Sequence, residues 1–182
     1  MKKIITVLSI VLILFSCASN KVEPVEDFYI EAKAVDMSIY NGVDAVKHCF
    51  KETSVSELTR VLEEKGSGVF YIGYKECPHC QILVQYLNEV AMDLGVTVYY
   101  IPGTDKTGNF IITGKIYDEL LKDLDPILDV NEDGEKAIYT PHVFTIIKGE
   151  FKESKISGGA ESSSEIKELK NEYRKILEPF RK

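Results

Sequence analysis

Several residue types are scarce or absent in this chain of 182 residues. Tryptophan is missing, so nothing in the sequence suggests a carbohydrate-stacking site or a choline cage. Basic residues are outnumbered, with 22 Lys and Arg against 29 Asp and Glu, which gives a formal net charge of −7. Non-specific nucleic-acid binding requires clustered basic side chains that displace counterions from phosphates, so this acidic composition argues against a nucleic-acid partner.

Recognisable metal and cofactor motifs are also lacking. The four cysteines include one C-x-x-C pair, with no second pair and no H-x₃-H motif to complete the four ligands of a structural zinc site. The glycines do not form a phosphate-binding loop. We therefore expect neither a metal nor a cofactor.

One apolar run stands out at the N-terminus. Met1, Lys2 and Lys3 precede an apolar stretch over residues 4–15 that is shorter than a membrane-spanning helix and has the layout of an export signal. Ser16 followed by Cys17 resembles the lipobox of bacterial lipoproteins, in which the cysteine is lipidated and becomes the first residue of the mature protein. An ordinary cleaved signal peptide or an uncleaved anchor are the alternatives.

This pattern predicts three parts of the chain. We expect a signal peptide over residues 1–16, lipidated Cys17 and a polar linker over 17–27, and a single domain over 28–182. The protein would then be extracytoplasmic, anchored to the bacterial cell membrane as a lipoprotein, in a compartment where disulfides persist.

Alternating strand and helix patterns follow one another through the domain. β-branched and aromatic runs predict strands, and apolar residues at helical spacing, with capping residues and glycine or proline stops, predict helices. Residues 28–42 show no clear pattern beyond an extra strand or edge segment. The predicted order is βαβαβαββα, a central mixed sheet with helices on both faces. The predicted strands cover residues 45–50, 69–74, 96–101, 143–147 and 151–156.

The C-x-x-C pair is Cys77-Pro78-His79-Cys80, placed between a predicted strand and a predicted helix. Residues three apart on a helix lie close enough to form a disulfide. At a helix N-terminus, the free N–H groups and the helix dipole favour a thiolate at Cys77. Pro78 suits the first helical position, and His79 can further stabilise the thiolate. A structural disulfide that closes so short a loop contributes little stability, so the pair is interpreted as redox-active.

These motifs, together with Thr140-Pro141 before the strand over 143–147, resemble the thioredoxin superfamily. The resemblance covers about residues 45–180 and implies a thioredoxin-like fold, catalytic Cys77 and Cys80, and a cis Thr140–Pro141 bond that meets the substrate. Within the superfamily, residues 71–80 (YIGYKECPHC) look most like the thioredoxin-like bacteriocin transport accessory proteins.

The sequence departs from the superfamily pattern in two places. Thioredoxins usually carry a buried acid six residues before the first active-site cysteine, and this chain has Tyr71 there. A tryptophan commonly precedes that cysteine, and here the residue is Glu76. A neighbouring carboxylate opposes the effect of His79 on the thiolate.

The resulting hypothesis is a membrane-anchored thiol–disulfide oxidoreductase. Its partners would be protein thiol or disulfide substrates and a redox partner protein, with oxidation or isomerisation favoured over reduction. The alternatives are a non-catalytic accessory module that presents peptides to a transporter, and a reductase that relays electrons to another thiol protein. Cys49 is expected to be a buried, inert thiol, and His142 a strand residue with a satisfied ring.

Overall fold

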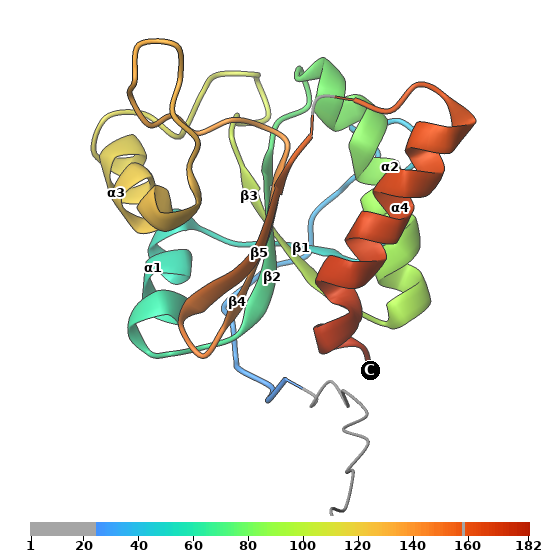
Figure 1. Ribbon diagram of the computed structural model, residues 1–182, viewed down its shortest axis with the longest axis horizontal. Coiled ribbons are helices and arrows are strands. Elements are labelled where there is room, and N and C mark those ends of the chain that lie inside the picture. Colours follow the sequence, from blue (N-terminus) through green and yellow to red (C-terminus); the bar gives the residue numbers. More distant parts are fainter. Residues whose placement is uncertain (1–24, 158) are drawn as a thin grey trace, which may run out of the picture.

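The computed structural model describes residues 25–157 and 159–182, which form two layers of helices around one sheet (Figure 1). The predictions for the signal peptide, Cys17 and most of the linker lie outside these described residues. None of the helices within them is long and apolar enough to span a bilayer. The strands are β1 (Phe50–Glu52), β2 (Gly68–Gly73), β3 (Val98–Pro102), β4 (His142–Ile147) and β5 (Glu150–Ile156), and the helices are α1 (Val55–Glu63), α2 (Pro78–Leu94), α3 (Lys115–Leu124) and α4 (Ser163–Leu177).

This arrangement confirms the predicted order βαβαβαββα. The strands lie in the order β1-β3-β2-β4-β5. Strands β1, β3 and β2 are parallel, whereas β4 is antiparallel to both of its neighbours. The sheet is therefore mixed, with two antiparallel pairs rather than only the closing hairpin.

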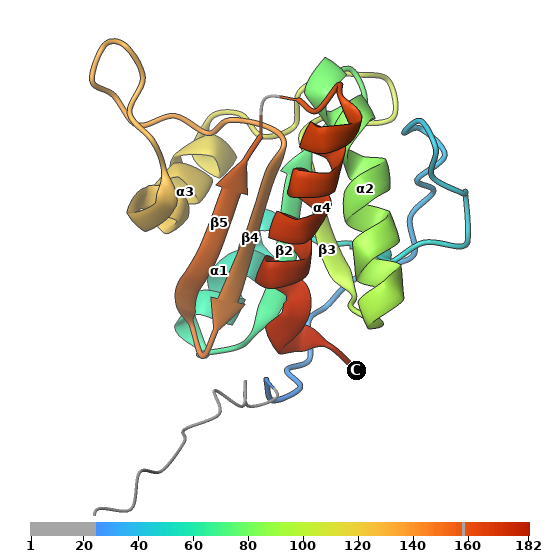
Figure 2. The same cartoon turned by 45° about the vertical axis from the view of Figure 1, so that its right-hand side comes forward.

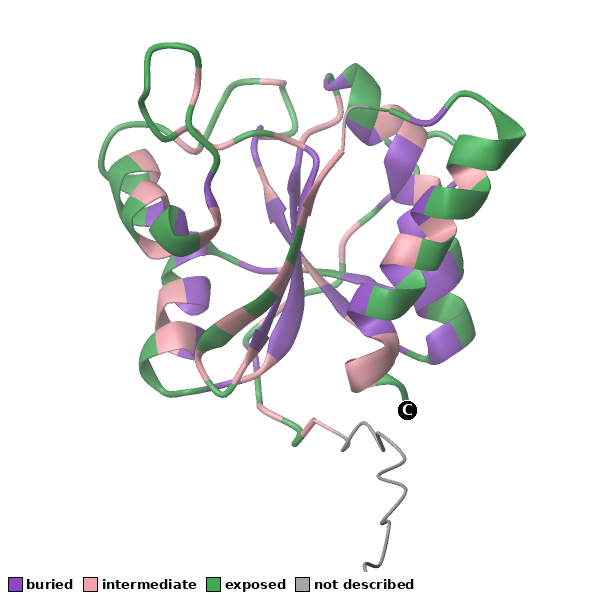
Figure 3. Ribbon diagram, in the orientation of Figure 1, coloured by how far each residue is buried: buried purple, intermediate pink, exposed green. Residues whose placement is uncertain are grey.

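The helices cover opposite faces of the sheet, α2 and α4 on one and α1 and α3 on the other (Figures 1 and 2). Alternate residues of β2 enter the two cores because side chains of a strand point to opposite faces. Val69 and Tyr71 pack under α2 and α4, and Phe70 and Ile72 pack under α1 and α3. All six residues of β2 are buried, as expected for a central strand (Figure 3).

One local prediction was wrong. The strand expected over residues 45–50 begins only at Phe50, because Asp44 Oδ1 accepts hydrogen bonds from the N–H groups of Val46 and Lys47 and holds a turn there. The start of α1 has only half of a capping box. Ser54 caps the helix by accepting from Glu57 N, but the Glu57 carboxylate bonds to Glu31 N and to Arg60 instead of returning to Ser54.

The unassigned segment before β1 is mostly irregular. It touches the sheet edge through an isolated antiparallel bridge between Lys33 and Glu52. Farther along, Met37 and Tyr40 are fully buried in the core beneath α2. Gln81 on α2 holds this segment in place, since its amide donates to Ile39 O at 2.9 Å and its Oε1 accepts from Asn41 N.

Candidate active site

Cys77 and Cys80 lie where β2 passes into α2, at one end of the sheet. Cys77 is the N-cap of α2, and its sulfur accepts a hydrogen bond from Cys80 N at 3.3 Å. Pro78 follows at the first helical position, where its missing N–H leaves no helical hydrogen bond unmade. An N–H donor aimed at the Cys77 sulfur stabilises negative charge there, as expected at a helix N-terminus.

The cysteines are both buried thiols. Cys77 is 4% exposed, and Cys80, in the first turn of α2, is fully buried. Burial raises the pKa of Cys80 to about 12, and a hydrogen bond that the Cys80 thiol donates to the neighbouring Cys77 acts in the same direction. The two sulfurs therefore differ in surroundings, since Cys77 lies at the helix end and Cys80 lies one turn inside.

The loop before β4 places Thr140 and Pro141 against Cys77. The Thr140–Pro141 bond is cis, which confirms the sequence-based expectation for its conformation. Thr140 O lies 3.7 Å from the Cys77 sulfur and accepts its S–H, while Thr140 Oγ1 lies 3.8 Å from the same sulfur. Residues 63 positions apart in sequence thus meet at the candidate nucleophile.

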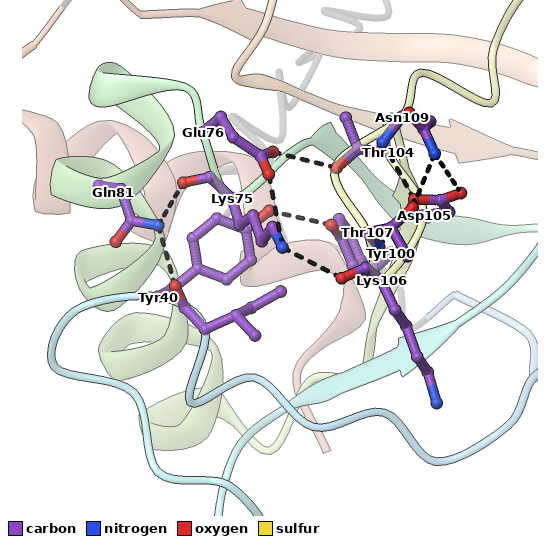
Figure 4. A network of polar contacts seen from close by, with 11 residues as sticks. Tyr40, Lys75, Glu76, Gln81, Tyr100, Thr104, Asp105, Lys106, Thr107 and Asn109 are labelled. Atoms are coloured by element: carbon purple, nitrogen blue, oxygen red, sulfur yellow. Dashed lines mark hydrogen bonds and ion pairs between the residues drawn. The ribbon is translucent and has the colours of Figure 1, made fainter.

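The other two predicted neighbours of the pair are exposed. His79 lies on the surface, and its Nδ1 would be 3.5 Å from a Cβ atom added at Gly159. Glu76 pairs with Lys75 at 3.5 Å and accepts from Thr104 Oγ1 at 3.2 Å (Figure 4). Its carboxylate is thereby engaged with the loop that follows β3.

His142 does not belong to the cysteine site. It pairs with Ile72 across β2 and β4, and is fully buried among the side chains beneath α1 and α3, on the face opposite Cys80. Its Nε2 bonds to Ser154 Oγ at 2.8 Å, but its Nδ1 has no partner among the described residues. The expected satisfied ring is therefore only half satisfied, and burial lowers the pKa of His142 to about 4.

Cys49 is a buried thiol away from the pair, in agreement with the sequence-based expectation. It is 8% exposed, and burial raises its pKa. Its backbone N–H donates to Asn88 Oδ1 at 3.0 Å. Across the described ranges, no three His, Cys, Asp or Glu side chains are grouped so as to hold a metal ion.

Sequence reasoning missed an aromatic hollow beside the pair. A cavity of about 360 Å³ lies next to Thr140 and is lined by residues from the loop after β3 and the loop before β4. Phe110 and Tyr139 contribute to it although 61% and 41% of their surfaces are exposed. Tyr74 packs edge-on against Phe110, with ring centroids 5.3 Å apart. Neither loop shows the spacing of apolar residues that is typical of a helix or a strand. The aromatic residues in the two loops were therefore the only sequence signal for this hollow.

No family model matches the chain, and no curated protein matches its sequence. Among solved structures, it is similar to thioredoxin O2 from Arabidopsis thaliana in the oxidised state, at 16% identity and a TM-score of 0.44, over 74% of this chain and 96% of that one. The chain has a thioredoxin-like fold, as its strand order, the placement of its helices and its cis-proline loop show.

Proposed function

We propose that this chain is a thiol–disulfide oxidoreductase that exchanges disulfides with protein substrates through Cys77 and Cys80. The observation that carries the proposal is the meeting of three features at one end of the sheet. The two thiols lie within one helical turn, the N–H of Cys80 faces the Cys77 sulfur, and the cis-proline loop contacts that sulfur through Thr140.

The roles of the two cysteines follow from their positions. The Cys77 thiolate attacks one sulfur of a substrate disulfide, forms a mixed disulfide and releases the other substrate sulfur as a thiolate. Cys80 then loses its proton and attacks Cys77 Sγ, which closes the Cys77–Cys80 disulfide. The second substrate sulfur leaves and takes up a proton, so the substrate gains the two electrons that the cysteine pair loses. Oxidation of a substrate dithiol runs through the same steps in reverse.

The aromatic hollow beside Thr140 supports binding of an extended peptide with an apolar side chain near its cysteine. Exposed aromatic side chains gathered in one concavity are typical of interaction sites. Thr140 and Pro141 would hold the peptide backbone against Cys77, and Phe110 would receive the apolar side chain.

Replacement of Phe110 separates peptide recognition from chemistry. Phe110→Ala should lower kcat/KM for a protein substrate by about tenfold, as for a central aromatic contact, and leave the reaction with glutathione disulfide unchanged. Val130→Ala is a matched control, because Val130 is 62% exposed and lies outside the hollow. Equal loss with both substrates would contradict a binding role for Phe110.

We further propose that the mature protein begins at lipidated Cys17 and works outside the cytoplasm, anchored to the bacterial cell membrane. The basic start, the apolar run and the Ser16-Cys17 pair support this. Two acyl chains suffice for stable anchoring, since each buried CH₂ contributes about 0.8 kcal/mol. Intact-mass analysis should find a diacylglyceryl adduct on Cys17, and a water-soluble mature form with an unmodified N-terminus would contradict the proposal.

The favoured direction is oxidation or isomerisation of exported proteins, with a redox partner protein that reoxidises the pair. Stabilising the reduced thiolate makes a disulfide a stronger oxidant, and His79 next to the pair would contribute positive charge. His79→Ala should therefore lower the reduction potential of the pair. An unchanged potential would remove His79 from the mechanism.

Turnover of a protein substrate tests the function as a whole. The full chain in mild detergent should catalyse both insulin reduction and oxidation of a reduced protein, and Cys77→Ala or Cys80→Ala should abolish catalysis. Cys49→Ala is the matched control and should retain it. If the wild-type chain binds peptides but exchanges no disulfide, the fold serves as a non-catalytic accessory module instead.

A further inference from the structure

Tyr71 is a fully buried tyrosine whose hydroxyl has no hydrogen-bond partner among the described residues. A buried hydroxyl without a partner loses its bonds to water, which costs about 1–3 kcal/mol. Native proteins rarely tolerate such a group without a reason. A chemical role for the Tyr71 hydroxyl would account for its being kept at this cost.

The side chain points along β2 toward the cysteine pair. Tyr71 and Gly73 lie on the same face of the strand, and a Cβ atom added at Gly73 would come within 2.0 Å of the Tyr71 hydroxyl. The hydroxyl thus occupies the space over the last residue of β2, four residues before Cys77. Glycine at position 73 is what allows the ring to extend that far.

Two other tyrosines fix the ring in this position. Tyr100, its partner on β3, stacks on it with centroids 5.4 Å apart, and Tyr40 meets it edge-on at 6.4 Å. Their own hydroxyls are satisfied, because they bond to each other at 2.9 Å and Tyr100 also donates to Gly73 O at 3.2 Å. Among these three hydroxyls, only that of Tyr71 forms no hydrogen bond with a described residue.

Cys80 is the reactive group beside it. Cys80 is fully buried in the same core as Tyr71, and desolvation is the main reason its pKa rises to about 12. The Tyr71 side chain and the backbone of Tyr74 both act to lower the pKa of Cys80, against this rise. A buried thiolate needs a donor, and no other unpartnered hydroxyl is buried in the part of the chain that the structure describes.

We propose that Tyr71 is a catalytic residue whose hydroxyl donates a hydrogen bond to the Cys80 thiolate during exchange. The inference rests on the proposed oxidoreductase function. In reduction of a substrate, the Cys80 thiol gives its proton to solvent, and its thiolate, held by Tyr71, attacks Cys77 Sγ. The Cys77–Cys80 bond forms, the bond between Cys77 and the substrate breaks, and the substrate thiolate takes a proton from solvent. In oxidation of a substrate, Tyr71 stabilises the same thiolate as the leaving group.

The test uses Tyr71→Phe in the full chain, with glutathione as the probe. A mixed disulfide between Cys77 and glutathione should resolve about tenfold or more slowly in the variant, since hydrogen bonds to charged groups are the stronger kind. Alkylation of reduced Cys77 should proceed at the wild-type rate. Tyr173→Phe is the matched control, because Tyr173 is 1% exposed in the same core and should leave resolution unchanged.

A titration distinguishes catalysis from a structural effect. In a Cys77→Ser background, the thiolate absorbance of Cys80 should appear at higher pH when Tyr71→Phe is added, and an unchanged midpoint would overturn the proposal. If Tyr71→Phe fails to fold, 3-fluorotyrosine at position 71 keeps the shape of the ring and makes its hydroxyl a stronger donor. The titration midpoint of Cys80 should then move to lower pH. An unchanged midpoint in this variant would also overturn the proposal. Failure of the proposed function itself would look different, because the wild-type chain would exchange no disulfide with glutathione.

Discussion

The buried imidazole of His142 predicts that the protein loses stability in mild acid. Its Nδ1 has no hydrogen-bond partner within residues 25–157 and 159–182, its Nε2 bonds to Ser154, and no part of the residue is exposed. Burial lowers the pKa of His142 from its ordinary value of 6.5 to about 4, although the nearby Asp129 acts in the opposite direction. The unfolded chain therefore binds this proton more readily than the folded chain, and stability falls as the pH falls through 6.5.

The size of the effect follows from the two pKa values. Between pH 7 and pH 5, the folded chain loses about 2 kcal/mol of unfolding free energy through His142. This window lies above the range in which most carboxylates titrate, and comparison with a variant that lacks the imidazole isolates the contribution of His142. Urea unfolding at the two pH values, with a thiol reductant present, gives the change. Far-UV circular dichroism is the suitable signal, since the chain has no tryptophan to report unfolding by fluorescence.

His142→Gln removes the titrating ring while its amide can still reach Ser154. The difference in stability between the wild type and this variant should change by about 2 kcal/mol from pH 7 to pH 5, in the direction that favours the variant in acid. Ser154→Ala is the matched control, because it removes the partner but leaves the buried ring and its pH dependence. Parallel pH dependences for the wild type and His142→Gln would refute the reasoning.

Two further predictions concern side chains outside the cysteine pair. Burial raises the pKa of Cys49, so this thiol should resist iodoacetamide in the folded chain and react only after unfolding. Peptide mass mapping can follow the labelling, and rapid labelling of Cys49 in the native state would contradict its burial. Glu57→Ala should cost about 2 kcal/mol in urea unfolding, because Glu57 is 8% exposed and accepts from Glu31 N and Arg60. Glu64→Ala removes a 54% exposed partner of the same arginine and should cost less than about 1 kcal/mol, so equal losses would show that burial is not the deciding factor.

The order of elements was predictable because local signals mark it clearly. Pro78 begins α2, Gly95 ends it in the left-handed conformation, and Ser162 with Glu165 forms the full capping box of α4. Local signals also misled at residues 45–50, where apolar residues suggested a strand but the Asp44 side chain holds a turn. Such a competition between a side-chain hydrogen bond and strand pairing is decided by tertiary context.

The candidate site was only partly predictable. The C-x-x-C pair, Pro78 and the cis Thr140–Pro141 bond could be inferred from motifs, but Tyr71 could be interpreted only as the absence of an acid. Its hydroxyl became informative when packing against Tyr40 and Tyr100 showed which way it points. The aromatic hollow depends on two irregular loops that come together in space, and sequence periodicity says nothing about such contacts.

A redox titration of the full chain tests the central claim most directly. Equilibration with mixtures of reduced and oxidised glutathione, acid quenching and alkylation would give the fraction of the chain with a Cys77–Cys80 disulfide. We expect a reversible two-electron transition, about 30 mV for each tenfold change, with a midpoint near or above about −180 mV if the protein oxidises or isomerises its substrates. A midpoint near about −270 mV would reverse the direction of the reaction. A pair that stays reduced, or stays oxidised, at every glutathione ratio would contradict a role in disulfide exchange.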